Sequence, residues 1–305
     1  MKNENCLVIG GCGFLGSSIV SLLLERGYDV TVLDDLSTGN LKLLDGKKVE
    51  FIKRDITDPD LLKVLPKRRF KFIFNFGSAS TDRAFSLNGV AAIRTIVGML
   101  NTLKIGIDTG AEKVVYPSSG TVYGNCRAPQ REEDNPKPLT MYASTKGYLE
   151  SVARINEREI PSVGLRIFTG YGGRERFKGS AASVVTLFYN EIVNGRAPIV
   201  FGDGEQRRDY VHSSNVAEIA VNAAESRVTG ILNAGSGLSH SSIELIDILN
   251  EKLGVNIKPK FIKSPLTHVA ETMADLGLVR QVFRYNPLDL RDGLDLFLRE
   301  ITTFQ

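Results

Sequence analysis

A run of glycines between an apolar segment and a helix-like segment constrains the fold of this chain more than any other feature. Residues 6–9 form a short apolar run, typical of a buried parallel strand. The glycine-rich run 10–16 follows it, and residues 14–26 have the pattern of a helix. Glycines at 10 and 13 allow a tight turn and a close approach of the backbone to a pyrophosphate at the positive helix end. The loop residues that we expect to contact such a ligand are Gly10, Gly13, Phe14, Leu15 and Gly16.

The rest of the chain alternates strand-like and helical segments. Further strands are expected near 29–33, 49–53, 71–75, 113–116 and 163–167. Strands that alternate with helices predict an α/β fold with a parallel, doubly wound sheet. From Thr169 a glycine-rich loop, a helix at 181–194 and short strands indicate a smaller α/β domain. We therefore expect residues 1–168 to form a dinucleotide-binding domain and residues 169–305 mainly a substrate domain, with some exchange of chain between the two lobes.

Composition restricts the kind of molecule that this chain is expected to bind. The net charge of +3 over 305 residues is too small to indicate nucleic acid or an acidic membrane surface, so a small molecule is expected. The three cysteines are few, odd in number and not at metal-binding spacing, so we expect neither disulfides nor a metal site. This pattern and a start without a hydrophobic signal region suggest a cytoplasmic protein.

Asp34 ends the second strand, near the spacing of about twenty residues expected for a ribose-binding carboxylate. A carboxylate there accepts hydrogen bonds from the ribose hydroxyls and repels a 2′-phosphate, which favours NAD over NADP. Asp55 follows the third strand and has two readings. It is placed to bond the adenine amino group, and it is equally placed to be a turn aspartate beside Thr57.

Tyr142 and Lys146 lie four residues apart in an expected helix at 141–158. Positions i and i+4 share one helix face, so the phenol and the ammonium can converge. A nearby cation favours the phenolate and lowers the pKa of the phenol, which makes Tyr142 a usable base. Alone, the spacing also fits an ordinary helical pair.

The order of phosphate loop, Asp34, Ser118-Ser119 and Tyr142/Lys146 resembles the extended short-chain dehydrogenase/reductases. More narrowly, the chain is similar to the NAD-dependent nucleotide-sugar epimerase/dehydratase family. Residues 34–39 resemble the segment after the second strand of UDP-galactose 4-epimerases, and residues 201–211 resemble the family's substrate-domain motif. The resemblance implies a Rossmann-like sheet that binds NAD.

The resemblance also implies roles for single residues. Tyr142 would be the catalytic base, Lys146 would tune it and hold the nicotinamide ribose, and Ser119 would bond the reacting hydroxyl. Ser118 and Ser119 can instead be strand-end hydroxyls that bond local backbone. Further implied contacts are Ile56, Phe76 and Ser118 to the cofactor, and Thr121, Thr169 and Arg208 to the substrate, with the Arg208 guanidinium gripping a diphosphate.

Gly120 and Thr121 discriminate between the reactions of this family. The family's 4,6-dehydratases have an Asp-Glu pair at these two positions, and its UDP-glucuronate decarboxylases have a Glu at the second. Neither Gly120 nor Thr121 transfers protons as a carboxylate does. The sequence therefore favours epimerisation, expected at C4 of a UDP-hexose, by transient oxidation to a keto-sugar. The alternatives are a dehydratase, decarboxylase or reductase that uses another carboxylate, such as Glu132 or Glu133, and a non-catalytic NAD-binding regulator.

Some positions depart from the family pattern. A second phosphate-binding arginine is expected near Pro265, in a segment where His268 replaces an Asp, and no Arg stands there. Lys263, Arg207 or Arg174 are possible substitutes. The long apolar helices expected at 84–105 and 141–158 imply, by resemblance, a homodimer.

Overall fold

The computed structural model describes residues 4–65, 68–81, 85, 89–263 and 269–303. Its centre is a sheet of seven strands in the order β10-β6-β5-β4-β1-β2-β3, and every neighbouring pair is parallel. This confirms the predicted Rossmann-like α/β fold. The strands are β1 (Asn5–Ile9), β2 (Asp29–Asp34), β3 (Glu50–Lys53), β4 (Phe72–Asn75), β5 (Lys113–Ser119), β6 (Ser162–Ile167) and β10 (Gly230–Ala234).

Helices cover both faces of the sheet because the side chains of each strand alternate between them. In β1, Cys6 and Val8 belong to the core under α1 and α7, whereas Leu7 and Ile9 belong to the core under α4 and α5. The helices of these layers are α1 (Phe14–Glu25), α2 (Leu61–Val64), α4 (Val90–Thr109), α5 (Met141–Ile155), α7 (Ser213–Glu225) and α9 (Gly277–Val282), with 3-10 turns η1 (Leu41–Leu44) and η2 (Gly120–Tyr123).

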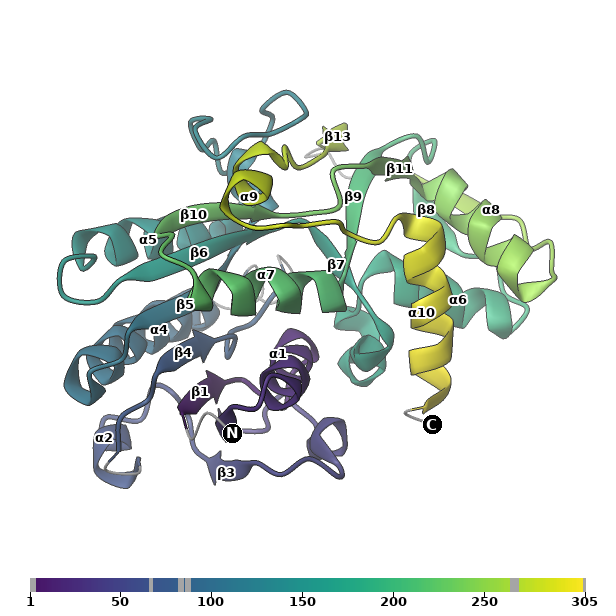
Figure 1. Ribbon diagram of the computed structural model, residues 1–305. Coiled ribbons are helices and arrows are strands. Elements are labelled where there is room, and N and C mark those ends of the chain that lie inside the picture. The colour runs from purple at the N-terminus through teal and green to yellow at the C-terminus, as the bar shows by residue number, and fades with distance from the viewer. Residues whose placement is uncertain (1–3, 66–67, 82–84, 86–88, 264–268, 304–305) are drawn as a thin grey trace.

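A smaller lobe lies beside the carboxyl edge of the sheet, at the right in Figure 1. It has its own core, built around Tyr210, Leu245 and Phe297. Its elements are β7 (Thr169–Tyr171), η3 (Gly173–Ala181), α6 (Val184–Val193), β8 (Ile199–Phe201), β9 (Arg207–His212), β11 (Ser239–Ser241), α8 (Ser242–Leu253), β12 (Lys260–Ile262), β13 (Glu271–Thr272) and α10 (Leu290–Thr303).

The two halves of the chain are interwoven. β10 and α7 come from the second half, yet β10 completes the large sheet next to β6 and α7 packs against α1. The three helices expected at 84–105, 141–158 and 181–194 appear as α4, α5 and α6. Residues 82–84 and 86–88, at the start of the first of them, lie outside the described residues.

By length and composition alone, α4 is apolar enough to cross a membrane. In the fold it packs on the sheet against β4 and β5 and alongside α5. Its apolar character therefore has a structural origin in the layer that it forms with α5.

Lys113 ties the second half of the chain to the sheet. It starts β5, and its buried Nζ donates to the carbonyl oxygens of Ala223, Ser226 and Val228 at 3.1, 2.6 and 2.8 Å. These carbonyls lie at and just beyond the end of α7, where the helix dipole favours a cation. Burial lowers the pKa of Lys113. The three hydrogen bonds to carbonyl oxygens stabilise its charged form.

Replacing Lys113 with Met should lower the free energy of unfolding by roughly 2–3 kcal/mol, because buried carbonyls lose a charged donor. Urea denaturation measures the loss. Lys104→Met is the matched control, since Lys104 is exposed and pairs with Asp108 on its own helix. Equal denaturation midpoints for the two variants would contradict the role of Lys113.

Candidate active site

The glycine loop leaves the start of α1 open to an anion. The N-cap residue, Gly13, makes no side-chain hydrogen bond to the helix, and the first turn holds no acidic residue. The first amides of α1 therefore have no side-chain cap. A Cβ on Gly16 would lie 2.0 Å from the Gly10 carbonyl oxygen, and Gly10 itself has φ +75°. The loop thus requires its glycines, and its backbone fits a pyrophosphate.

A pocket of about 340 Å³ runs from this loop along the carboxyl ends of β1 to β4. It lies at the point where the strand order reverses, the usual ligand position in a doubly wound sheet. Predicted cofactor residues that line it are Gly10, Gly13, Asp34, Asp55, Ile56 and Phe76. The same pocket reaches Ser78, whose hydroxyl accepts a hydrogen bond from Lys146 at 3.2 Å. A more open hollow of about 610 Å³ over residues 125–137 contains none of the predicted site residues.

Asp34, which the sequence predicts to bind a ribose, is fixed at the end of β2. Its carboxylate accepts hydrogen bonds from the amides of Cys12 and Leu36 at 2.9 and 2.8 Å. Burial raises the pKa of Asp34 and outweighs the lowering effect of these two amides. The carboxylate joins the phosphate loop to the end of β2 and lines the pocket.

Asp55 shows the turn role that the sequence left open. One oxygen accepts from the amide and hydroxyl of Thr57 at 2.8 and 2.9 Å, and the other accepts from Arg94 at 2.7 Å. Burial raises the pKa of Asp55, but Thr57 and Arg94 more than offset this and lower it. The sequence analysis did not identify Arg94, because its position relative to the strand ends depends on how α4 packs.

Tyr142 and Lys146 share one face of α5, as predicted. The helix is capped by the Thr140 hydroxyl, which accepts from the Ala143 amide at 3.2 Å. Lys146 Nζ lies 5.6 Å from the centroid of the Tyr142 ring. It donates to the Pro117 carbonyl oxygen at 3.0 Å, and burial lowers the pKa of Lys146 to about 8.

Ser119 lies at the end of β5, in the turn that leads to η2. Its Oγ accepts from the amide and hydroxyl of Thr121 at 3.2 and 2.9 Å. With these acceptor positions used, the Ser119 proton remains available to a further oxygen. Thr121 therefore orients Ser119.

Ser118 bonds to the helix layer. Its hydroxyl donates to Glu150, which forms a buried ion pair with Arg166 at 2.8 Å. Arg166 is the direct neighbour of Ser118 in the sheet. Glu150 follows Lys146 by four residues, so it continues the face of Tyr142 and Lys146. That spacing was a signal in the sequence, but it was not interpreted.

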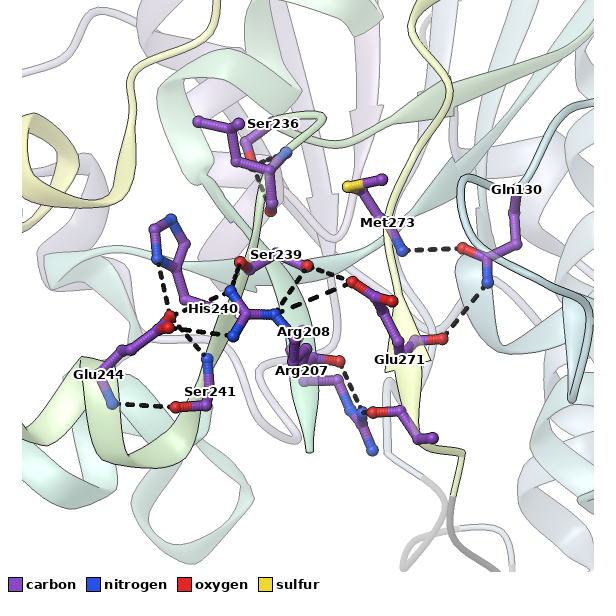
Figure 2. A network of polar contacts seen from close by, with 12 residues as sticks. Gln130, Arg207, Arg208, Ser236, Ser239, His240, Ser241, Glu244, Glu271 and Met273 are labelled. Atoms are coloured by element: carbon purple, nitrogen blue, oxygen red, sulfur yellow. Dashed lines mark hydrogen bonds and ion pairs between the residues drawn. The ribbon is translucent and has the colours of Figure 1, made fainter. Parts of the chain in front are cut away.

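Arg208 is held differently from its neighbour Arg207, because adjacent strand residues face opposite ways. Figure 2 shows Arg207 between Glu244 and Glu271, and its guanidinium bonds Glu244 at 3.0 Å. Arg208 donates to the carbonyl oxygens of Arg207 and Ala270 at 2.8 and 3.4 Å. Among the described residues no carboxylate pairs with it, and burial lowers its pKa. A partly desolvated guanidinium in this state suits an anionic ligand.

Other candidate residues make contacts within the protein. Arg174 reaches back to Leu43 and Ser21, so it ties η3 to the nucleotide-binding half. Glu132 accepts from the Asn233 amide at 2.7 Å, and exposed Glu133 lies 3.8 Å from Arg131.

The remaining predictions concern the substrate side and metal binding. Thr169 lies on β7 beside Tyr210 of β9. Pro265 and His268 fall outside the described residues, and Lys263 is the last residue before that gap. Within the described parts of the chain, no group of three or more His, Cys, Asp or Glu side chains could hold a metal ion.

The buried charge of Lys146 predicts a pH-dependent stability. Its pKa is about 8 in the fold and 10.5 ordinarily, so between these values the unfolded chain binds more protons. The free energy of unfolding, measured without nucleotide, should therefore rise relative to Lys146→Met by up to about 1.4 kcal/mol per pH unit in this window. A constant difference between pH 7 and pH 9.5 would contradict it.

Comparison with known proteins agrees with this geometry. Residues 6–235 match the family model of the NAD dependent epimerase/dehydratase family. The UDP-glucose 4-epimerase of Mycolicibacterium smegmatis is 31% identical over 301 residues, 94% of this chain and 95% of the relative.

Two solved structures are similar over almost their whole length. The UDP-glucose 4-epimerase of Thermotoga maritima, solved with UDP-glucose, has a TM-score of 0.93 and 27% identity, covering 98% of this chain and 99% of that one. The ADP-L-glycero-D-manno-heptose-6-epimerase of Helicobacter pylori has a TM-score of 0.89 and 32% identity, covering 99% and 97%. With the pocket, the phosphate loop and the Tyr142/Lys146 face in place, the chain belongs to the NAD-dependent epimerase/dehydratase family of nucleotide-sugar enzymes.

Proposed function

We propose that this enzyme epimerises a UDP-hexose at C4. The observation that carries the proposal is the position of Ser119, at the end of β5, and of Thr121, in η2, beside the helix α5 that carries Tyr142 and Lys146, without a carboxylate at 120 or 121. Oxidation and re-reduction of one carbon need a proton acceptor and a hydroxyl partner, both of which this group offers. Water elimination and decarboxylation need a further acid or base.

The carboxylates that a dehydratase or decarboxylase might recruit support the same conclusion. Glu132 is bound to the Asn233 amide at the sheet edge, and Glu133 lies on the exposed loop. Glu132 is therefore engaged by the backbone, and Glu133 is 77% exposed to solvent. The named relatives with UDP-glucose 4-epimerase activity favour C4 and UDP, while the heptose 6-epimerase shows that similar chains act on other sugars.

The residues divide the work as follows. The glycine loop and Asp34 would hold NAD, which would supply reversible hydride transfer at one substrate carbon. Tyr142 takes the hydroxyl proton and gives it back, while Ser119 bonds the same oxygen. Lys146 places its charge beside the phenol and favours the phenolate. Arg208 holds the diphosphate, so that the sugar can turn while the nucleotide stays fixed.

Incubation with UDP-galactose, UDP-glucose and their N-acetyl forms should interconvert at least one pair, measured by chromatography of the nucleotide sugars. Tyr142→Phe should lower kcat by about 10²- to 10⁴-fold, because the proton acceptor is lost. The variant should still bind NAD. A non-catalytic regulator would also bind NAD, but its unchanged chain would show no turnover. No turnover of any of the four sugars would reject the proposal, and elimination or decarboxylation products would replace it with another reaction.

We also propose a homodimer built on α4 and α5. Apolar side chains recur on the outer faces of both helices at intervals of seven residues: Ile93, Leu100 and Ile107 on α4, and Met141, Tyr148 and Ile155 on α5. Ile155 is 79% exposed, and a Cβ on Gly147 would contact nothing within 4 Å in this chain. A mid-helix glycine costs about 1 kcal/mol relative to alanine. Close approach of a partner helix would account for both features.

The double variant Tyr148→Glu/Ile155→Glu should be monomeric by light scattering, because it places charges in the apolar face. Ile199→Glu is the control, since Ile199 is an exposed apolar residue on β8, away from both helices. A monomeric mass for the unchanged chain would contradict the dimer.

We infer a cytoplasmic enzyme, since Cys6, Cys12 and Cys126 are all free thiols.

A further inference from the structure

An arginine spans the open side of the cofactor pocket. Arg94 NH2 lies 2.7 Å from Asp55 Oδ2 and 3.3 Å from Asp35 Oδ2. Asp35 follows the end of β2 and Asp55 follows the end of β3. One guanidinium therefore links α4 to the ends of two strands beside the pocket.

The helix face that carries Arg94 shapes this end of the pocket. Val90, Ala91 and Arg94 all line it and lie on one side of α4. The first two are small enough to leave space, whereas Arg94 extends across it. Its side chain is 48% exposed, so Arg94 is accessible from the pocket that it lines.

The charges explain why a cation is held here. Asp34, Asp35 and Asp55 lie together at the pocket edge, and a pyrophosphate adds further negative charge at the loop. Asp34 is bonded by two backbone amides and Asp55 by Thr57, but Asp35 and Asp55 share Arg94 as their ion-pair partner. Both carboxylates bond the same nitrogen, NH2, and so hold this end of the guanidinium at the pocket edge more firmly than a single exposed pair would.

We propose that Arg94 is an adenine-contact residue: held by Asp35 and Asp55, its guanidinium forms the outer wall on which the adenine ring of NAD packs. A planar guanidinium stacks on flat aromatic faces and is weakly hydrated. Asp55 Oδ2 keeps a lone pair next to Arg94 that can accept from the adenine amino group. The structure thus reconciles the two readings of Asp55, since Thr57 occupies the other oxygen.

Calorimetric titration with ADP-ribose and with nicotinamide mononucleotide, which lacks adenine, tests this wall. Arg94→Ala should weaken ADP-ribose binding by roughly three- to thirty-fold, the range for a desolvated cation–π contact. Binding of nicotinamide mononucleotide should change less than two-fold. If the purified chain retains its nucleotide, the rate of exchange with labelled NAD compares Arg94→Ala with the unchanged chain. The matched control is Arg69→Ala, because Arg69 is exposed and pairs with Glu112 at the opposite end of the sheet.

Arg94→Lys separates the stacking surface from the charge. Lysine keeps a cation between the two carboxylates but has no planar group, so it should recover less than half of the lost affinity on a logarithmic scale. Full recovery in Arg94→Lys would overturn the proposal, as would equal weakening of both ligands or unchanged affinity in Arg94→Ala. A sugar-epimerisation assay is not needed for this test, so its failure is independent of the reaction proposed above.

Discussion

Two side chains of α5, one helical turn apart, hold the end of β5, and the catalytic geometry depends on this attachment. Lys146 donates to the Pro117 carbonyl oxygen, and Glu150 accepts from the Ser118 hydroxyl. These are the two residues directly before Ser119. A helix and a strand that were free to slide by one residue would move Tyr142 relative to Ser119, because side chains on a strand alternate between faces. The attachment fixes their register.

The energetic cost of this arrangement shows that it serves more than stability. Lys146 is buried, no carboxylate of the described residues pairs with it, and burial lowers its pKa. The Glu150–Arg166 pair is also buried, and such pairs contribute little net stability compared with apolar packing. Removing one partner alone would nevertheless be costly. Lys146, Glu150 and Arg166 are therefore buried behind the end of β5 at an energetic cost. This cost is explained if the fold preserves the orientation of these side chains.

How far the sequence could predict this structure depends on the range of the interactions. The phosphate loop, Asp34 and the Tyr142/Lys146 face are local patterns, so their positions follow from the strand and helix that carry them. The sequence analysis did not identify Arg94, because its partners Asp55 and Asp35 lie 39 and 59 residues away in sequence. They follow two strands whose spacing is set only by the sheet. β10 was missed for a similar reason. Its five residues join the sheet only after α7 has crossed it, and no short-range signal distinguishes them from the strands of the smaller lobe.

In the smaller lobe, the alternation of side chains along β9 separates two arginine charges. β9 carries Arg207 and Arg208 in succession, and two neighbouring arginines would repel each other if they faced the same way. The strand sends Arg207 to Glu244 and Glu271, as Figure 2 shows, where its charge is neutralised within the lobe. Among the described residues, Arg208 bonds only carbonyl oxygens, so its positive charge is not neutralised by a carboxylate there. If Arg208 binds the substrate diphosphate as proposed, that anion would meet a single oriented guanidinium rather than a diffuse basic patch.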